Sequence, residues 1–353
     1  MRPTGIAAQR VGSVARMRVD GGAQGDLTNA AAAAKTAEEA GYDGFWTAET
    51  SHDPFFPLLL AAQATETIQL GTSIAVAFAR TPMVTANIGW DLQNFSKGRF
   101  ILGLGSQIRP HIEKRFSMPW SGKPASQMRE YISALRAIWD SWQNGTKLDF
   151  RGDYYTHTLM TPFFNPGPNP YGTPKVFLAG VGQGMTRVAG ETCDGFLAHG
   201  FTTEKYAREV TMPALEQGLA KAGRKREDFE ISLPAFVVTG TTEEEMKAAE
   251  VGTRQQIAFY GSTPNYRGVL EAHGWGDLQT ELNGLSKEGK WVEMGKVIDD
   301  EMLNAFAVVA EPEQLAAKLS GRWKGLADRV SFYAPYKSNP ERWRQVLVDL
   351  KAA

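Results

Sequence analysis

Cysteine and long apolar runs are what this sequence most clearly lacks. Cys193 is the single cysteine among 353 residues, which excludes a disulfide framework within the chain and a cysteine-rich zinc site. A reducing compartment is therefore expected, and we predict a cytoplasmic protein. No apolar run approaches the roughly 20 residues that a membrane-spanning helix needs, so no membrane is expected as a partner.

An excess of either charge is missing as well. The 38 Lys and Arg residues almost balance the 39 Asp and Glu residues, and the formal net charge is -1. This balance gives no reason to expect nucleic acid as a partner. The 42% hydrophobic and 22% charged fractions are those of a globular protein. A small molecule is the expected substrate.

Several catalytic motifs are also absent. The five histidines form neither a His-x-His pair nor an H-E-x-x-H motif, so no metal is expected. The chain has no G-x-S-x-G elbow either, which excludes a serine hydrolase of that type. A glycosidase needs only two carboxylates at strand ends, and Glu49 with Glu113 leaves that alternative open.

Strand-like and helix-like segments alternate along the chain. Eight segments are predicted to be strands, and each precedes a helical pattern: residues 17–19, 42–47, 68–78, 99–103, 175–179, 194–199, 229–240 and 328–335. Eight β-α units in one chain of this length predict an α/β fold, a closed (β/α)8 TIM barrel. In that fold the chemistry lies on the loops that follow the strands.

Long loops and a short extension complete the predicted organisation. Insertions follow strands 4 and 7, at residues 104–125 and 261–310, and we interpret them as substrate walls. Residues 17–353 are predicted to form a single barrel domain. Residues 1–16 form an N-terminal extension without a secretory h-region, and we expect it to be poorly ordered.

Glycines gather where two of the predicted strands end. After the fourth strand, Gly103 and Gly105 permit close approach of a ligand, and Ser106 and Gln107 offer hydrogen bonds. After the fifth strand, free backbone N–H groups and a helix N-terminus suit a phosphate, although a plain tight turn explains the same pattern. The residues of this second turn are Gly180, Val181, Gly182, Gln183, Gly184 and Met185.

Polar side chains on two strand-end loops are candidates for proton transfer. His52 follows the second strand, where a histidine can donate a hydrogen bond or a proton, and Glu49 lies close by in the sequence to orient a partner. His111 and Glu113 follow the fourth strand within a run of charged residues. We interpret His52, His111 and Glu113 as candidate catalytic residues, with an exposed, purely solvated face as the alternative.

Four stretches of the chain, in this order and spacing, resemble the bacterial luciferase-like superfamily of flavin- and deazaflavin-dependent oxidoreductases. They read AEEAGYDGFWTAET, IQLGTSIAVAFARTP, SKGRFILGLGSQ and KVFLAGVGQGMTRVAGETCDGF. The likeness runs from Met17 to about Gly240. It is greatest to the actinobacterial branch of oxidoreductases that use coenzyme F420.

This resemblance implies a barrel that holds the F420 deazaflavin ring at the carboxyl ends of its strands. The cofactor phosphate would lie on the turn of Gly180–Met185, and His52 would lie near the reactive edge of the ring. A homodimer is also implied. The other implied cofactor contacts are Glu49, Ser73, Ile74, Gly103, Gly105, Ser106 and Gln107.

One implied contact concerns the third strand, QLGTSIAVAF, which carries Gly-Thr-Ser where a core strand normally holds branched apolar residues. In the F420 enzymes that the chain resembles, this segment holds a bulge with a non-prolyl cis peptide bond. The matching bond is Ser73–Ile74. The small residues would let the backbone protrude beneath the ring.

One position departs from the resemblance. In F420-dependent sugar-phosphate dehydrogenases a glutamate follows the fourth-strand turn, whereas this chain has Ile108. A sugar phosphate is therefore not the expected substrate, and Glu113 or His111 is the hypothesis for proton transfer. Two alternatives stay open. One is an FMN-dependent monooxygenase that uses reduced flavin and O2, and the other is a flavin-binding protein without catalysis.

Overall fold

Eight parallel strands close into a barrel in the computed structural model, which describes residues 16–23 and 27–352. Each barrel strand pairs with the next, and the last pairs with the first through Val19 and Val330. The predicted TIM barrel is therefore confirmed. The barrel strands are β1 (Arg18–Ala23), β2 (Gly44–Thr47), β3 (Gln69–Thr72) with β4 (Ala75–Val76), β5 (Phe100–Gly105), β8 (Lys175–Gly180), β9 (Gly195–Ala198), β10 (Glu230–Val238) and β12 (Arg329–Tyr333).

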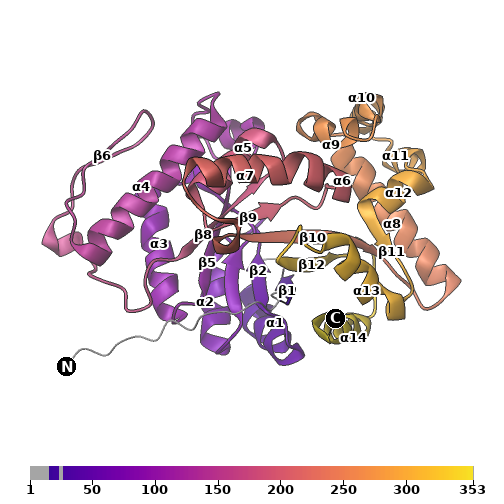
Figure 1. The fold of residues 1–353 in the computed structure, drawn as a ribbon, viewed down its shortest axis with the longest axis horizontal. Helices are drawn as coiled ribbons and strands as arrows, with labels where there is room; N and C mark the ends of the chain where they lie inside the picture. The colour runs from indigo at the N-terminus through magenta and orange to yellow at the C-terminus, as the bar shows by residue number, and fades with distance from the viewer. Residues whose placement is uncertain (1–15, 24–26, 353) are drawn as a thin grey trace.

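Helices cover the outside of the barrel (Figure 1), and several begin where the sequence carries a start signal. Thr81 caps α3 by accepting from the Val84 N–H, with Pro82 in the first turn. Thr242 caps α8, whose first turn is acidic. The covering helices are α1 (Leu27–Ala40), α2 (Phe55–Ala64), α3 (Pro82–Phe95), α4 (Pro124–Asn144), α5 (Gln183–Thr192), α6 (Glu204–Tyr206), α7 (Met212–Lys221), α8 (Glu243–Gly261), α13 (Pro312–Trp323) and α14 (Pro340–Ala352).

The second insertion and the segment that follows α4 lie at opposite ends of the long axis of the molecule (Figure 1). The first insertion contains the π-helical turn η2 (His111–Arg115). The segment that follows α4 forms a small hairpin of β6 (Phe150–Arg151) and β7 (Thr156–His157). The second insertion is mostly helical. It contains η6 (Pro264–Tyr266), α9 (Arg267–Glu271), α10 (Gly276–Lys287), α11 (Trp291–Val297) and α12 (Asp300–Phe306).

Two elements before the last barrel strand were missed by the sequence analysis. Strand β11 (Ala307–Val309) extends the sheet by pairing with β10, and α13 follows it. The hairpin of β6 and β7 was also missed. These strands have only two or three residues, which is too short for a hydrophobic alternation to be visible.

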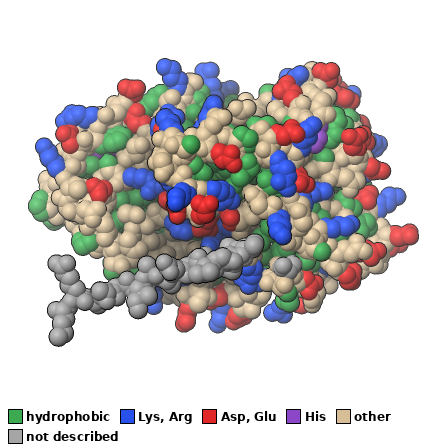
Figure 2. Space-filling model, viewed as in Figure 1, with side chains coloured by type: hydrophobic (Ala, Val, Ile, Leu, Met, Phe, Trp, Pro, Cys, Tyr) green, Lys and Arg blue, Asp and Glu red, His purple; other side chains and the backbone are tan. Residues whose placement is uncertain are grey.

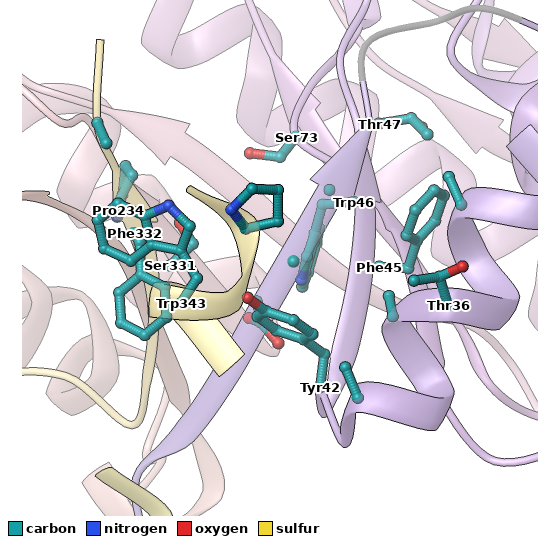
Figure 3. Close-up of a pocket in the computed structure, with 18 of the residues that line it drawn as sticks. Thr36, Tyr42, Phe45, Trp46, Thr47, Ser73, Pro234, Ser331, Phe332 and Trp343 are labelled. Atoms are coloured by element: carbon teal, nitrogen blue, oxygen red, sulfur yellow. The ribbon is translucent and has the colours of Figure 1, made fainter. Parts of the chain in front are cut away.

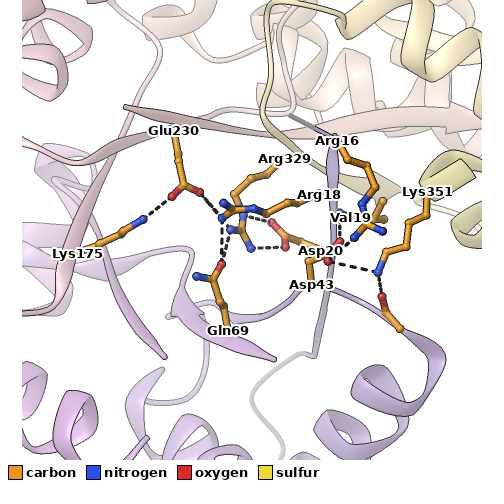
Figure 4. Close-up of polar contacts among 11 residues, drawn as sticks. Arg16, Arg18, Val19, Asp20, Asp43, Gln69, Lys175, Glu230, Arg329 and Lys351 are labelled. Carbon is orange, nitrogen blue, oxygen red and sulfur yellow. Dashed lines mark hydrogen bonds and ion pairs between the residues drawn. The ribbon is translucent and has the colours of Figure 1, made fainter. Parts of the chain in front are cut away.

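Charged side chains fill the amino-terminal end of the barrel (Figure 4). Arg329 is fully buried and donates to both carboxylate oxygens of Asp20, at 2.8 and 2.7 Å, and to Gln69 at 2.5 Å. Glu230 accepts from Arg18 at 2.8 Å and from Lys175 at 2.6 Å. Burial alone raises the pKa of Glu230, but the hydrogen bond from Lys175 and the nearby positive charges outweigh burial and lower it.

The outer surface carries charges of both signs. Figure 2 shows acidic and basic side chains interspersed over the viewed face, as the balanced composition predicts. Among the helices of the described residues, none is both long enough and apolar enough to cross a membrane.

Candidate active site

A cavity of about 1160 Å³ joins the barrel interior to the gap between α1 and α14 (Figure 3). Its inner part is lined by Trp46 of β2, Ser73 after β3, and Leu197 of β9. Its outer part reaches Tyr42 and Trp343. Ser73, predicted to contact the cofactor, therefore borders open space inside the barrel.

The third predicted strand is broken at the place that the sequence singled out. We predicted one strand over residues 68–78, but β3 ends at Thr72, β4 covers only Ala75–Val76, and a 3-10 turn, η1 (Ala77–Ala79), follows. The predicted single strand is thus wrong. The Ser73–Ile74 peptide bond between the two pieces is cis, which confirms that prediction.

A side-chain hydroxyl holds the broken strand against its neighbour. Thr72 donates through Oγ1 to the Gly103 carbonyl at 2.7 Å and accepts from the Gly103 N–H at 2.9 Å. The Thr72 side chain is fully buried, so this hydroxyl replaces the missing ladder bonds between β3 and β5. The sequence analysis missed this role of Thr72. A hydroxyl at a position where a core strand normally holds a branched apolar residue was the available signal.

Glycines beside the break make room for larger neighbours. A Cβ at Gly103 would lie 1.7 Å from the Thr72 carbonyl oxygen, so only glycine fits there. A Cβ at Gly105 would lie 2.9 Å from the Ile74 side chain, and one at Gly71 would lie 2.4 Å from the Trp46 ring. The predicted contacts Gly103, Gly105, Ser73 and Ile74 are thus adjacent at the carboxyl ends of β3 and β5.

Glu49 clamps the loop after β2 to the short strand β4. Its carboxylate accepts from the Val76 N–H and from Arg80, both at 2.7 Å, while its own N–H donates to the Ile74 carbonyl at 3.0 Å. Arg80 also pairs with Asp53 at 3.1 Å. These contacts place Glu49 directly behind the break, where it positions the Ile74 backbone. Its contact with the cofactor stays a prediction.

The three predicted catalytic side chains are exposed on loops. His52 lies between β2 and α2, and His111 and Glu113 lie on η2. The Glu113 carboxylate pairs with Arg109 at 3.0 Å. Arg115 donates to the Thr50 carbonyl, which links the two loops. The structure thus joins the segments of His52 and His111, but the catalytic roles stay predictions.

The end of β5 turns through a left-handed residue. Gln107 has a φ of 58°, and its side-chain oxygen accepts from the Ile108 N–H at 3.2 Å. Ser106 donates through its hydroxyl to the Gln107 carbonyl at 3.1 Å. Both predicted contacts are half-buried at the barrel mouth, and this local bonding fixes the turn.

The glycine turn after β8 presents the start of α5 without a capping side chain. Gly180 ends β8, Gly182 is the N-cap, and no side chain caps the helix that begins at Gln183. A Cβ at Gly182 would meet nothing within 4 Å, so the space beside it is open. The first N–H groups of a helix lack intrahelical partners and favour anions. The residues present therefore fit a phosphate group.

The turn is fixed from behind by a tyrosine. Tyr206 donates to the Val181 carbonyl at 3.0 Å, and Met185 packs so closely that a Cβ at Gly180 would lie 3.1 Å from it. Because Leu104 of β5 pairs with Leu178 of β8, this turn and the end of β5 lie side by side.

A polar aromatic cluster at the opposite wall was missed by the sequence analysis. It consists of His199, Tyr260, Tyr266 and Tyr333, whose rings contact one another. His199 is one of the five histidines that form no metal motif, although its place at the end of the sixth predicted strand was a usable signal of a functional role. Within the described residues, no group of three or more His, Cys, Asp or Glu side chains is arranged to hold a metal ion.

Comparison with known proteins places this geometry in a family. Residues 10–329 match the family described as luciferase-like monooxygenase. An uncharacterized protein of Mycobacterium tuberculosis (strain H37Rv) is 58% identical over 320 residues, which cover 91% of this chain and 94% of the relative. A putative coenzyme F420-dependent oxidoreductase of the same organism is 28% identical over 301 residues, covering 80% of this chain and 84% of the relative.

A solved structure has the same fold. The coenzyme F420-dependent tetrahydromethanopterin reductase of Methanopyrus kandleri superposes with a TM-score of 0.75 at 21% identity, covering 96% of this chain and 98% of the reductase. The family match spans most of the sequence, and the 58% identical relative covers most of both chains. The chain therefore belongs to the luciferase-like monooxygenase family.

Proposed function

We propose that this protein is a coenzyme F420-dependent oxidoreductase that transfers a hydride between the deazaflavin and a small organic substrate. The observation that carries the proposal is the adjacency of two features at one edge of the barrel. The uncapped N-terminus of α5 suits a phosphate, and the break at Ser73–Ile74 lies beside it across β5. A phosphorylated chain that ends in a flat ring matches this arrangement.

The relatives support the same proposal. One is named as a putative F420-dependent oxidoreductase, and the superposed structure is an F420-dependent reductase. When bound, the deazaflavin supplies or accepts the hydride. The protein then has to fix the two reactants against each other and to supply or remove one proton.

Each group of residues has a separate task in this proposal. The backbone of Gly180–Met185 holds the phosphate, and Gly103, Gly105 and Ile74 border the ring. Thr72 and Glu49 do not need to touch the cofactor, since they fix the backbone on both sides of the break. His52, His111 and Glu113 stay candidates for proton transfer at the open side of the ring.

A homodimer is part of the proposal. Four large apolar side chains are exposed on α2 and α3: Phe56 at 61%, Leu59 at 43%, Val84 at 48% and Phe95 at 51%. The helices α2 and α3 pack against each other, and exposed large apolar side chains on neighbouring helices support an interface. Sedimentation velocity of the wild type and of Phe56→Glu tests this. We expect a dimer for the wild type and a monomer for the variant, and a monomeric wild type would contradict it.

Titration of the purified protein with F420 and with FMN, followed by absorbance, tests the proposed cofactor. We expect saturable binding of F420, and then bleaching or recovery of its absorbance with a substrate. Binding of FMN alone would overturn F420 in favour of the monooxygenase. Binding of F420 without turnover over a broad panel of alcohols and carbonyl compounds would favour the non-catalytic alternative.

A further inference from the structure

The cluster of His199, Tyr260, Tyr266 and Tyr333 joins the second insertion to the barrel mouth. His199 directly follows β9 and Tyr333 ends β12, whereas Tyr260 lies on α8 and Tyr266 on η6. The His199 ring centroid lies 4.7 Å from the centroids of both Tyr260 and Tyr266. All four side chains are partly exposed, so a ligand at the mouth can reach them.

Three phenylalanines form a rigid base beneath these rings. Phe201, Phe236 and Phe306 are at most 2% exposed. Phe201 stacks on Phe306, and Phe236 stacks on Tyr333, both with centroids 4.6 Å apart. Such packing fixes ring orientations. The hydroxyl groups above this base are therefore held in place before any ligand binds.

The hydrogen bonds of His199 determine where its proton lies. The Phe201 N–H donates to Nδ1 at 3.0 Å, so a neutral ring carries its proton on Nε2. Burial lowers the pKa of His199 to about 4, so the ring is neutral at pH 7. Nε2 lies 3.3 Å from the Tyr266 hydroxyl oxygen and donates to it.

Because the Tyr266 hydroxyl oxygen accepts the hydrogen bond from His199, the Tyr266 hydroxyl hydrogen is available to another acceptor. Burial raises the pKa of Tyr266, so the phenol keeps its proton at neutral pH. The Tyr260 and Tyr333 hydroxyls lie 2.7 Å apart, and only one of them can donate to the other. Among the described residues, the cluster therefore offers hydroxyl hydrogens that no protein acceptor takes.

The surroundings of these donors are neutral. Within the part of the chain that the structure describes, no hydrogen bond, ion pair or cation-π contact joins these four side chains to Lys, Arg, Asp or Glu. A phosphate or carboxylate would lie here without a counter-charge, which costs several kcal/mol in a partly buried site. A neutral oxygen acceptor on an apolar molecule fits both the donors and the aromatic walls.

We infer that Tyr266 binds the oxygen of a neutral ketone, aldehyde or alcohol substrate, with His199 as the positioning residue. This rests on the proposed function only for the hydride, and it assigns the proton transfer to Tyr266 in place of the candidates His52, His111 and Glu113. In the reducing direction a bound reduced deazaflavin would supply the hydride to the carbonyl carbon, and Tyr266 would give its proton to the oxygen as the C=O π bond breaks. The product is an alcohol. The phenolate oxygen keeps the hydrogen bond from His199 Nε2 until water returns the proton.

Binding of a matched pair of probes to the protein without cofactor tests this inference. Acetophenone has a carbonyl oxygen, and α-methylstyrene has a CH2 group in its place. We expect the wild type to bind acetophenone about three- to tenfold more tightly, the effect of one hydrogen bond. Tyr266→Phe should abolish the preference, because it removes only the hydroxyl oxygen. Tyr171→Phe, an exposed tyrosine outside the cluster, should keep it.

The role of His199 has its own readout. Nitrogen-15 NMR of the histidine rings should show the Nε2–H tautomer for His199, with a pKa near 4. His199→Phe should reduce the preference for acetophenone while leaving the tyrosine in place. If that variant fails to fold, the acetophenone preference of Tyr266→Phe alone tests the inference.

Equal binding of both probes by the wild type, or an unchanged preference in Tyr266→Phe, would overturn the inference. The titration with F420 and FMN is independent of these probes. A protein that prefers acetophenone but does not bind F420 would overturn the proposed cofactor and leave the oxygen site standing.

Discussion

At the amino-terminal end of the barrel, Arg329 is fully buried and its donors are used by Asp20, Gln69 and Glu230. At the carboxyl end, by contrast, the N-terminus of α5 has no capping side chain, and no acceptor among the described residues takes the Tyr266 hydroxyl hydrogen. One end satisfies its polar groups internally, and the other leaves donors for a ligand. In TIM barrels the first arrangement supports stability and the second supports chemistry.

The largest expected effect is a loss of stability when the buried charges at the amino-terminal end of the barrel lose a partner. Arg329→Ala leaves Asp20 buried without its partner, and we expect the free energy of unfolding to fall by about 3–5 kcal/mol. Urea denaturation measures this. Arg109→Ala is the matched control. It removes an exposed pair with Glu113, and a change of about 0–1 kcal/mol is expected. Similar losses of unfolding free energy in both variants would show that burial does not distinguish the ion pairs of the amino-terminal end from an exposed pair at the carboxyl end.

The next effect concerns the broken strand. Thr72→Val keeps the shape of the side chain but removes the hydroxyl that satisfies both the N–H and the carbonyl of Gly103. We expect a loss of about 2–4 kcal/mol in unfolding free energy, since each buried unsatisfied group costs about 1–3 kcal/mol. Thr253→Val is the control, because the buried Thr253 hydroxyl has no partner among the described residues. It should be neutral or stabilising, and an equal loss would contradict the bridging role.

Much of the carboxyl end could be predicted from local sequence. The Gly-x-Gly turn after the fourth strand and the glycine turn before α5 lie within short stretches whose small residues are visible in the chain, whereas the cis Ser73–Ile74 bond was predicted from the family resemblance. Glycine spacing and helix start signals are local properties, so they can be recognised without knowledge of the fold. The eight β-α units are visible for the same reason.

The aromatic cluster on the opposite wall of the barrel mouth could not be predicted from local sequence. His199 and Tyr266 are 67 residues apart, and Tyr260 and Tyr333 are 73 residues apart. No periodicity links residues at such distances, and a lone histidine or tyrosine carries little local signal. The buried Arg329–Asp20 pair spans 309 residues and was equally invisible. Contacts that depend on barrel closure become visible only in the fold.

A smaller effect, on F420 affinity, is expected when a side chain occupies the uncapped N-terminus of α5. Gly182→Asp places a carboxylate at the N-cap, where it would repel a phosphate and occupy the same N–H groups. We expect F420 affinity to fall about tenfold or more, equivalent to roughly 1.4 kcal/mol, with stability changed by only a few tenths of a kcal/mol. Gly182→Ala, whose Cβ has open space, should bind normally. An unchanged affinity of Gly182→Asp for F420 would show that the phosphate binds elsewhere.

The smallest expected effect is a dependence of stability on pH. His199 has an ordinary pKa of 6.5, which burial lowers to about 4 in the folded protein. Between these values the unfolded chain binds a proton that the folded protein does not. The free energy of unfolding therefore falls as the pH drops from about 6.5 to about 4.

His199→Gln should weaken that dependence, as thermal unfolding at pH 7, 5.5 and 4.5 can show. His52→Gln, at an exposed histidine, should leave the dependence as it is in the wild type. A wild-type pH dependence that His199→Gln does not alter would contradict the neutral, buried state of this ring.

The most direct test of the account measures both ligands on two variants. F420 and acetophenone are each titrated into Gly182→Asp and Tyr266→Phe, beside the wild type. We predict that Gly182→Asp loses F420 binding but keeps the preference for acetophenone over α-methylstyrene, and that Tyr266→Phe does the reverse. Loss of both properties in either variant, or of neither property in both, would contradict the assignment of cofactor and substrate to separate walls of the mouth.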